Sequence, residues 1–299
     1  MRDAPTIDVD LVRRLIAEQF PGWAGLEVRP VRADGWDNRT FRLGGTLSVR
    51  LPSAAGYAPQ VAKEVEWLPH VASGVPLPVP QVVGVGVPGC GYPWAWTVRR
   101  WIDGVPATAA VGAGRDGLVL AGDLARFLVA LREVEPAGPR PGVHSAGRGA
   151  ALDQWDGQVR EAISTSGPRV DRQMAERRWA QARAAATVPA PAVWFHGDVA
   201  PGNLLLRDGR LAAVIDFGCA GVGDPACDLA VAWTTLDAQA RAVFRRAMAV
   251  DDATWARGTG WALWKALITQ DDPRHRADSA RALGALGVVE VRRPDTADG

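Results

Sequence analysis

The first hundred residues combine two hydrophobic periods. Residues 8–20 and 60–72 repeat apolar side chains every three to four positions, which predicts two helices, the first capped by Asp8. Short runs that alternate, or that are apolar throughout, predict strands at residues 26–32, 40–43, 46–51, 81–87 and 94–101. Gly44-Gly45 fits a hairpin turn between two of them. This part predicts a sheet accompanied by one key helix.

From about residue 107 the helical period dominates. It predicts helices at residues 118–132, 152–163, 171–186, 228–236, 238–249 and 254–268. One hairpin interrupts them, because strand-like residues 203–207 and 211–215 flank the turn dipeptide Asp208-Gly209. The last dozen residues predict a frayed tail. We expect an α+β chain with a sheet-rich lobe, residues 1–102, and a mostly helical lobe, residues 103–299.

Composition narrows the class of protein. Lys and Arg number 34 against 33 Asp and Glu, so the net charge of +1 gives no electrostatic case for nucleic acid or a membrane surface. The N-terminus lacks the features of a signal peptide, and no apolar run reaches the roughly 18 residues of a membrane helix. Cys90, Cys219 and Cys227 fit free thiols better than disulfides or zinc. We expect a cytoplasmic monomer or weak dimer.

Polar side chains lie just before the predicted hairpin and at its two ends, at positions where packing would not require them. Pairing across the turn brings Asn203, at the start of the first strand, close to Asp216, at the end of the second. Asp198 lies on the loop that leads into the first strand. Carboxylate and amide oxygens suit Mg²⁺ and are poor ligands for zinc. One Asp and one Asn on a metal, with a second Asp free to accept a proton, fit phosphoryl transfer.

The order of these motifs, HGD, then Asn203, then IDFG and GDPACDLA, resembles the aminoglycoside phosphotransferase family, which shares the protein kinase architecture. The resemblance covers most of the chain and implies a bilobal fold, with nucleotide bound by the N-terminal lobe and acceptor by the C-terminal lobe. It implies that Asp198 is the catalytic base and that Asn203 and Asp216 bind Mg²⁺. The residues implied as structural support are His196, Asp224 and Asp228.

The resemblance also implies a nucleotide site on the N-terminal sheet. The family usually places a Lys on a strand for the phosphates, but both lysines here, Lys63 and Lys265, fall in predicted helices. Arg50 is therefore the candidate, with a solvated strand residue as the alternative. The resemblance favours Glu64 over Glu66 as its partner. Backbone amides of residues 35–38, GWDN, are a further candidate for the phosphates, with a plain turn as the alternative. The predicted adenine contacts are Ser48, Trp101, Ile102, Leu205 and Ile215.

The predicted function is Mg²⁺-dependent transfer of the γ-phosphate of ATP or GTP to a hydroxyl of a small molecule. An aminoglycoside, another antibiotic or a metabolite are all open as the acceptor. Residues 113–178 hold nine acids against ten arginines, which does not favour a cationic acceptor. Carboxylates that could still line a cationic pocket are Asp153, Asp156, Asp271 and Asp272. Aromatic residues that could stack on a sugar ring are Trp155, Trp261 and Trp264.

Other functions stay open at this stage. His196 and Asp198 with the distant His275 would make the iron-binding triad of non-haem oxygenases, although this leaves Asn203 and IDFG unexplained. A kinase-like domain that binds nucleotide without catalysis is a second alternative. A kinase of a metabolic alcohol that is not an antibiotic is a third.

Overall fold

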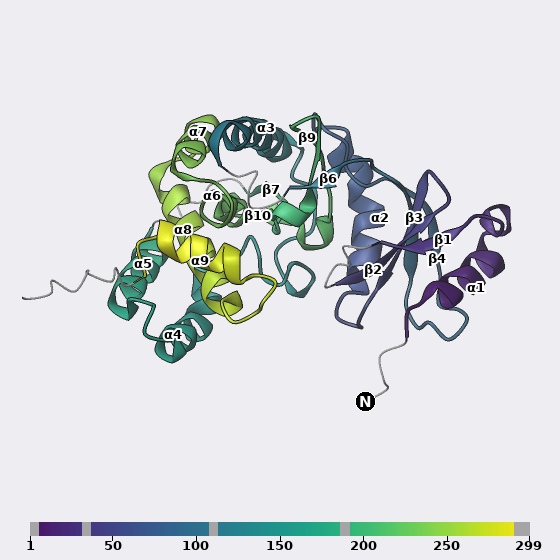
Figure 1. Ribbon diagram of the computed structural model, residues 1–299, viewed down its shortest axis with the longest axis horizontal. Helices are drawn as coiled ribbons and strands as arrows, with labels where there is room; N and C mark the ends of the chain where they lie inside the picture. Colours follow the sequence, from purple (N-terminus) through teal and green to yellow (C-terminus); the bar gives the residue numbers. More distant parts are fainter. Residues whose placement is uncertain (1–5, 32–36, 108–112, 186–191, 290–299) are drawn as a thin grey trace, which may run out of the picture.

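Alternating runs of the N-terminal part form one antiparallel sheet. The computed structural model describes residues 6–31, 37–107, 113–185 and 192–289, and its five-stranded sheet has the order β1-β2-β3-β5-β4 (Figure 1). The strands are β1 Val28–Pro30, β2 Asn38–Leu43, β3 Leu47–Pro52, β4 Val82–Gly86 and β5 Trp96–Arg100. Leu47, Val49 and Leu51 of β3 belong to the apolar core of this lobe. Ser48 and Arg50 therefore share the other face, as the alternation predicts.

Two helices pack against the sheet in different ways. Helix α1, Val9–Gln19, begins where the Asp8 carboxylate accepts a 2.8 Å hydrogen bond from the Leu11 N–H, and its apolar face joins the core of the sheet. Helix α2, Pro59–Ala72, lies between the sheet and the rest of the molecule (Figure 1). Its Leu68 and Val71 belong to the larger core of the second lobe. One helix thus connects both lobes.

The second lobe is mostly helical, which confirms the predicted α+β bilobal class. Its helices are α3 Gly114–Glu133, α4 Asp156–Thr165, α5 Arg172–Ala184, α6 Val231–Thr234, α7 Ala238–Met248, α8 Asp252–Thr269 and α9 Arg276–Ala285. The helix predicted over residues 228–236 is instead a 3₁₀ segment, Pro225–Ala230, followed by the short α6. Helix α9 was not predicted, because Ala282 and Leu283 are its only buried apolar residues.

The predicted hairpin is a ribbon at the junction of the lobes. Strands β8, Leu204–Arg207, and β9, Arg210–Val214, are joined by Asp208 and Gly209, whose φ values of 53° and 74° match a two-residue hairpin turn. The Ile215 N–H donates to the Asn203 carbonyl at 2.9 Å, so the two ends of the ribbon do lie together.

Three short strands were not predicted, because two or three residues show no periodicity. Strand β6, Val105–Pro106, pairs with β8 and extends the ribbon. Strand β7, Val193–Phe195, pairs with β10, Gly221–Gly223. This second pair flanks the HGD and DFG segments on the side of the helical core.

Other expectations concern cysteine, the membrane and the C-terminus. The three cysteines are free thiols. In the part of the chain that the structure describes, no helix is long and apolar enough to cross a membrane. The predicted tail lies outside the described residues from 290 onward. At its start the prediction was wrong, because Val288 is fully buried and Val289 forms a β-bridge with Val170.

Candidate active site

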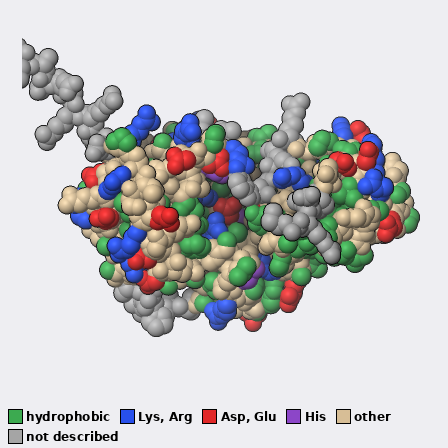
Figure 2. Space-filling model, turned by 90° about the horizontal axis from the view of Figure 1, so that it is seen from below, with side chains coloured by type: hydrophobic (Ala, Val, Ile, Leu, Met, Phe, Trp, Pro, Cys, Tyr) green, Lys and Arg blue, Asp and Glu red, His purple; other side chains and the backbone are tan. Residues whose placement is uncertain are grey.

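A cavity of about 600 Å³ opens between the two lobes, beside the ribbon. The sheet lobe contributes Asp37, Tyr57 and Gln60 to its wall, and the helical lobe contributes most of the rest. Figure 2 shows acidic and basic side chains gathered in a hollow between the lobes. Asp198, Asn203 and Asp216 line the cavity together. The structure therefore brings these residues of the predicted catalytic centre into one place.

A buried carboxylate holds the shape of the loop that carries Asp198. Asp228, which is 1% exposed, accepts hydrogen bonds from the N–H of His196 at 2.9 Å and of Gly197 at 2.7 Å. Gly197 has φ of 84°, and a Cβ there would lie 2.8 Å from the carbonyl oxygen of Cys219, so only glycine fits. Asp224 caps the 3₁₀ segment Pro225–Ala230, which contains Asp228, and pairs with Arg257 at 2.6 Å.

The His196 ring lies inside this loop and is fully buried. Its Nδ1 accepts from the N–H of Asp198 at 3.2 Å, and its Nε2 lies 3.0 Å from the carbonyl oxygen of Ile215. A ring whose Nδ1 accepts carries its proton on Nε2, which donates to that carbonyl. His196 therefore ties the loop to the end of β9.

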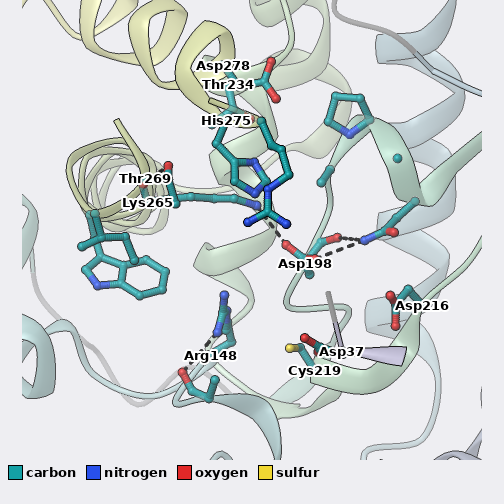
Figure 3. A pocket seen from close by; sticks show the side chains of 18 of the residues that line it. Asp37, Arg148, Asp198, Asp216, Cys219, Thr234, Lys265, Thr269, His275 and Asp278 are labelled. Carbon is teal, nitrogen blue, oxygen red and sulfur yellow. Dashed lines mark hydrogen bonds and ion pairs between the residues drawn. The ribbon is translucent and has the colours of Figure 1, made fainter. Parts of the chain in front are cut away.

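Both carboxylate oxygens of Asp198 have partners (Figure 3). Oδ1 accepts from Lys265 Nζ at 2.9 Å, and Oδ2 accepts from Asn203 Nδ2 at 3.2 Å. The same Asn203 amide donates to the Asp198 carbonyl at 2.9 Å. Burial alone would raise the pKa of Asp198, but the charge and hydrogen bond of Lys265, together with the charge of Arg148, outweigh burial and hold that pKa well below its usual range. An ionised carboxylate therefore faces the cavity.

Lys265 is a site residue that the sequence did not reveal. Helix α8 carries it 67 positions beyond Asp198, and only the packing of α8 beside the loop brings the two together. The sequence drew attention to Lys265 only through the rarity of lysine, since the chain has two lysines, Lys63 and Lys265. Lys63 is engaged elsewhere, because its Nζ donates to the carbonyls of Gly218 at 2.5 Å and Ala220 at 3.0 Å.

Asp216 opens the DFG segment in the left-handed conformation, with φ of 67°. Few side chains other than Gly, Asn and Asp adopt this conformation readily, and strained positions of this kind occur often at functional sites. Its carboxylate forms an ion pair with Arg50 of β3. Arg50 Nη1 also lies 3.8 Å from Glu64 Oε1 of α2. The predicted metal ligand and the predicted phosphate ligand are thus in contact.

Glu64 has a second partner that the sequence did not reveal. Arg99 Nη2 of β5 lies 2.7 Å from Glu64 Oε2, and both side chains are buried. Burial opposes ionisation, but Arg99 and Arg50 outweigh it and lower the pKa of Glu64 to about 2. Arg99 stands opposite Ser48 in the pairing of β3 with β5. The face predicted to receive adenine therefore has a buried ion pair beside Ser48.

The predicted adenine contacts are not among the described residues that line this cavity. Leu205 is buried but belongs to neither core, because its neighbours Leu204 and Leu206 point into the helical lobe. Trp101 lies under the guanidinium of Arg42, 4.0 Å from the ring centroid. Of the GWDN segment, residues 35 and 36 lie outside the described residues. The five predicted adenine contacts that do not line the cavity are Ser48, Trp101, Ile102, Leu205 and Ile215.

The residues considered for the acceptor divide into two groups. Asp153 and Asp156 pair with Arg183, and Asp272 pairs with Arg274. Neither these carboxylates nor Asp271 are among the described residues lining the cavity. Among the aromatic candidates, Trp264 lines the cavity, and Trp155 packs against Trp264 with 5.0 Å between ring centroids. Trp261 and Trp264 both belong to the core of the helical lobe, and Trp264 is 4% exposed.

The iron-binding triad does not form. Among the described residues there is no group of three or more His, Cys, Asp or Glu side chains placed to hold a metal ion. His275 lines the cavity, but both ring nitrogens of His196 are already engaged, one by the N–H of Asp198 and the other by the carbonyl of Ile215.

A protein-family model described as the phosphotransferase enzyme family, APH, matches residues 27–267. The chain belongs to this family. The match spans both lobes and contains every predicted site residue, from Ser48 to Asp228. It confirms the resemblance seen in the motifs and the prediction that the protein is a phosphotransferase.

Solved structures of antibiotic phosphotransferases share the fold of this APH-family chain. The GDP complex of wild-type aminoglycoside 2'-phosphotransferase-IIIa is 20% identical, with a TM-score of 0.69 over 94% of this chain and 98% of that one. Apo macrolide 2'-phosphotransferase MphH from Brachybacterium faecium is 21% identical, with a TM-score of 0.62 over 95% and 99%. ADP-bound aminoglycoside phosphotransferase APH(2'')-Ib is 16% identical, with a TM-score of 0.61 over 94% and 97%. A search of curated protein sequences found no match.

Proposed function

We propose that this APH-family protein transfers the γ-phosphate of ATP or GTP to a hydroxyl of a small molecule, with Asp198 as the catalytic base. The observation that carries the proposal is the ionised Asp198 carboxylate, held in the cavity by Asn203 and Lys265 beside Asp216. In the step, the acceptor oxygen bonds to the γ-phosphorus while the bond to the β–γ bridging oxygen breaks. The hydroxyl proton passes to Asp198, and the nucleoside diphosphate leaves.

A base with a low pKa acts mainly by orienting the hydroxyl, because it accepts the proton only once the new bond has largely formed. Lys265 keeps the carboxylate ionised, and Asn203 fixes its orientation through two hydrogen bonds. His196 and Asp228 hold the loop in which the base lies. These residues supply the positioning that a phosphoryl transfer needs.

The donor set fits Mg²⁺. The nitrogen of the Asn203 amide donates to Asp198, which leaves the amide oxygen for a cation, and Asp216 adds a carboxylate. Two protein oxygens suit an ion that retains waters and binds substrate phosphates. When bound, Mg²⁺ would neutralise charge on the phosphate oxygens.

The nucleotide is proposed to lie against the sheet lobe, residues 1–102, with acceptor and catalytic residues in residues 103–299. Arg50 presents a planar, permanently charged fork, and Glu64 holds that guanidinium. Relatives of the same fold bind GDP and ADP, which supports a nucleotide co-substrate. A cytoplasmic monomer or weak dimer stays a prediction. The proposed adenine contacts remain Ser48, Trp101, Ile102, Leu205 and Ile215.

Replacing the base tests the proposal. Asp198→Asn keeps the shape but removes the proton acceptor, so ADP release in the presence of an acceptor should fall by about 10²- to 10⁴-fold. Binding of Mg²⁺–ADP should stay within about threefold of wild type. Asp208→Asn in the exposed β8–β9 turn is the matched control and should retain activity. Wild-type activity in Asp198→Asn would overturn the assignment, and nucleotide binding without turnover on a broad acceptor panel would favour the non-catalytic module.

A further inference from the structure

The acceptor side of the cavity has more cationic side chains than carboxylates. Apart from Asp198 and Asp216, the described residues of the helical lobe contribute Arg148, Lys265 and Arg274, against Asp278 alone. Asp37 comes from the sheet lobe and lies near Asp216 in Figure 3. Because Lys265 pairs with Asp198 and Arg274 pairs with Asp272, the excess of positive charge that an acceptor meets on this side is small.

Arg148 is the cation of this group that lacks a carboxylate partner. Lys265 pairs with Asp198 at 2.9 Å, and Arg274 pairs with Asp272 at 2.8 Å. No carboxylate of the described residues lies within 4.0 Å of the Arg148 guanidinium, whose hydrogen bond is a long one, 3.4 Å, to the carbonyl of Ala146. A guanidinium in this state can bind a carboxylate or phosphate through two parallel hydrogen bonds.

The position of Arg148 favours the acceptor as its ligand. Figure 3 shows Arg148 and Lys265 on the side of Asp198 away from Asp216, which is the proposed metal ligand. The Arg148 guanidinium also lies over the ring of Trp264, 5.1 Å from the centroid, and both residues line the cavity. An acceptor hydroxyl that reaches Asp198 from this side passes both.

The same side offers little to a polycation. Of the carboxylates considered for binding a cationic acceptor, Asp153 and Asp156 pair with Arg183 outside the cavity. Asp272 does not line the cavity either, and it pairs with Arg274, which does. Asp278 remains, and burial raises its pKa, which weakens its charged form. Ammonium groups of an acceptor would meet Arg148 and Lys265 with few counter-charges.

We propose that the acceptor is a hydroxyl compound with a carboxylate or phosphate group, that Arg148 binds this group, and that Trp264 contacts the adjoining apolar surface. The inference rests on the proposed function and names its substrate class. An anionic acceptor would distinguish this chain from structural relatives that are named for aminoglycosides, which are cationic antibiotics.

Charge-matched probes test the acceptor class. ADP release would be measured with Mg²⁺–ATP and glucose, glucuronate, glucosamine, glycerol, 3-phosphoglycerate and kanamycin, and binding to the Mg²⁺–ADP complex would be measured by calorimetry. We expect glucuronate or 3-phosphoglycerate to exceed its neutral counterpart in kcat/KM or affinity. Arg148→Gln should lower that value about 10- to 100-fold more than it lowers the value for the neutral compounds.

Arg148→Lys should retain part of the preference, and Arg140→Gln, an exposed change in the same loop, should retain all of it. The proposal is overturned if glucosamine or kanamycin is preferred, if no anionic probe is bound or phosphorylated, or if Arg148→Gln affects all charge classes alike. The two failures are separable. The proposed reaction is judged by Asp198→Asn, and the acceptor class by Arg148→Gln.

Discussion

At the scale of single residues, the environment of Asp198 sets the chemistry. Its carboxylate receives one hydrogen bond from Asn203, five positions away, and another from Lys265 on a distant helix. Burial and the Lys265 cation act in opposite directions on its pKa, and the cation prevails. The proposed base is thus kept ionised by a residue that no local motif contains.

Replacing Lys265 should change the pH profile in a definite direction. In Lys265→Met the cation is lost, so burial raises the pKa of Asp198 and the ionised base appears only at higher pH. The wild type should therefore show no acid limb from Asp198 above pH 4.5, whereas in Lys265→Met this limb of log kcat/KM should move up into that range, since a limb follows the pKa of the free enzyme. Rates from pH 4.5 to pH 8 check this. Lys265→Arg retains the charge and should show little movement, whereas an unmoved limb in Lys265→Met would contradict the role.

At the scale of elements, helix α2 positions two parts of the site through its adjacent polar residues Lys63 and Glu64. Glu64 faces the sheet and pairs with Arg50 of β3 and Arg99 of β5. Lys63, the adjacent residue, donates to two carbonyls of the segment after Asp216, and burial lowers its pKa to about 8. One helix therefore positions the proposed phosphate ligand and the DFG segment together.

Removing the charge of Glu64 should destabilise the fold and alter its acid sensitivity. The folded-state pKa of about 2 lies below the ordinary 4.5, so ionised Glu64 stabilises the protein above pH 4.5, and this contribution is lost as pH falls toward 2. Glu64→Gln should lower the free energy of unfolding by about 3 kcal/mol at pH 7 and by much less near pH 3. Urea unfolding at several pH values checks this. Glu66→Gln, exposed on the same helix, should change neither quantity.

At the scale of the whole molecule, the site exists only where the lobes meet. Arg50 comes from the sheet lobe, whereas Asn203 and Asp216 come from the helical lobe. Each lobe has its own apolar core, and α2 connects them by placing Leu68 and Val71 in the larger core. The boundary at residues 102 and 103 stays a prediction. A nucleotide held by both lobes should stabilise the molecule as a unit.

Nucleotide and metal should therefore act together on thermal stability. At about 100 times its Kd, Mg²⁺–ADP should stabilise the fold by about 2.7 kcal/mol, which corresponds to several degrees in Tm. EDTA should remove most of this shift, because ADP alone lacks the proposed contacts through Asn203 and Asp216. Arg50→Met should reduce it as well. A shift of the same size in EDTA would argue against the proposed metal ligands.

Local patterns predicted much of the fold. The β8–β9 hairpin follows from Asp208-Gly209, because Asp-Gly is among the few residue pairs that adopt two positive φ values with little backbone strain. Helix α1 follows from Asp8 and its apolar stripe. Patterns of this kind require only near neighbours, so they can be read from the chain. Segments without such patterns, including α9 and the pairing of β7 with β10, could not.

The sequence by itself determined the bilobal α+β class, the family, and the polar residues that the ribbon brings together around Asp198. The tertiary structure alone decided which charges surround them. Lys265, Arg148 and Arg99 reach the site from segments far along the chain, whereas Asp153 and Asp156 pair with Arg183 outside it. Electrostatic partners depend on distance through space and on burial, and neither quantity is encoded in local periodicity.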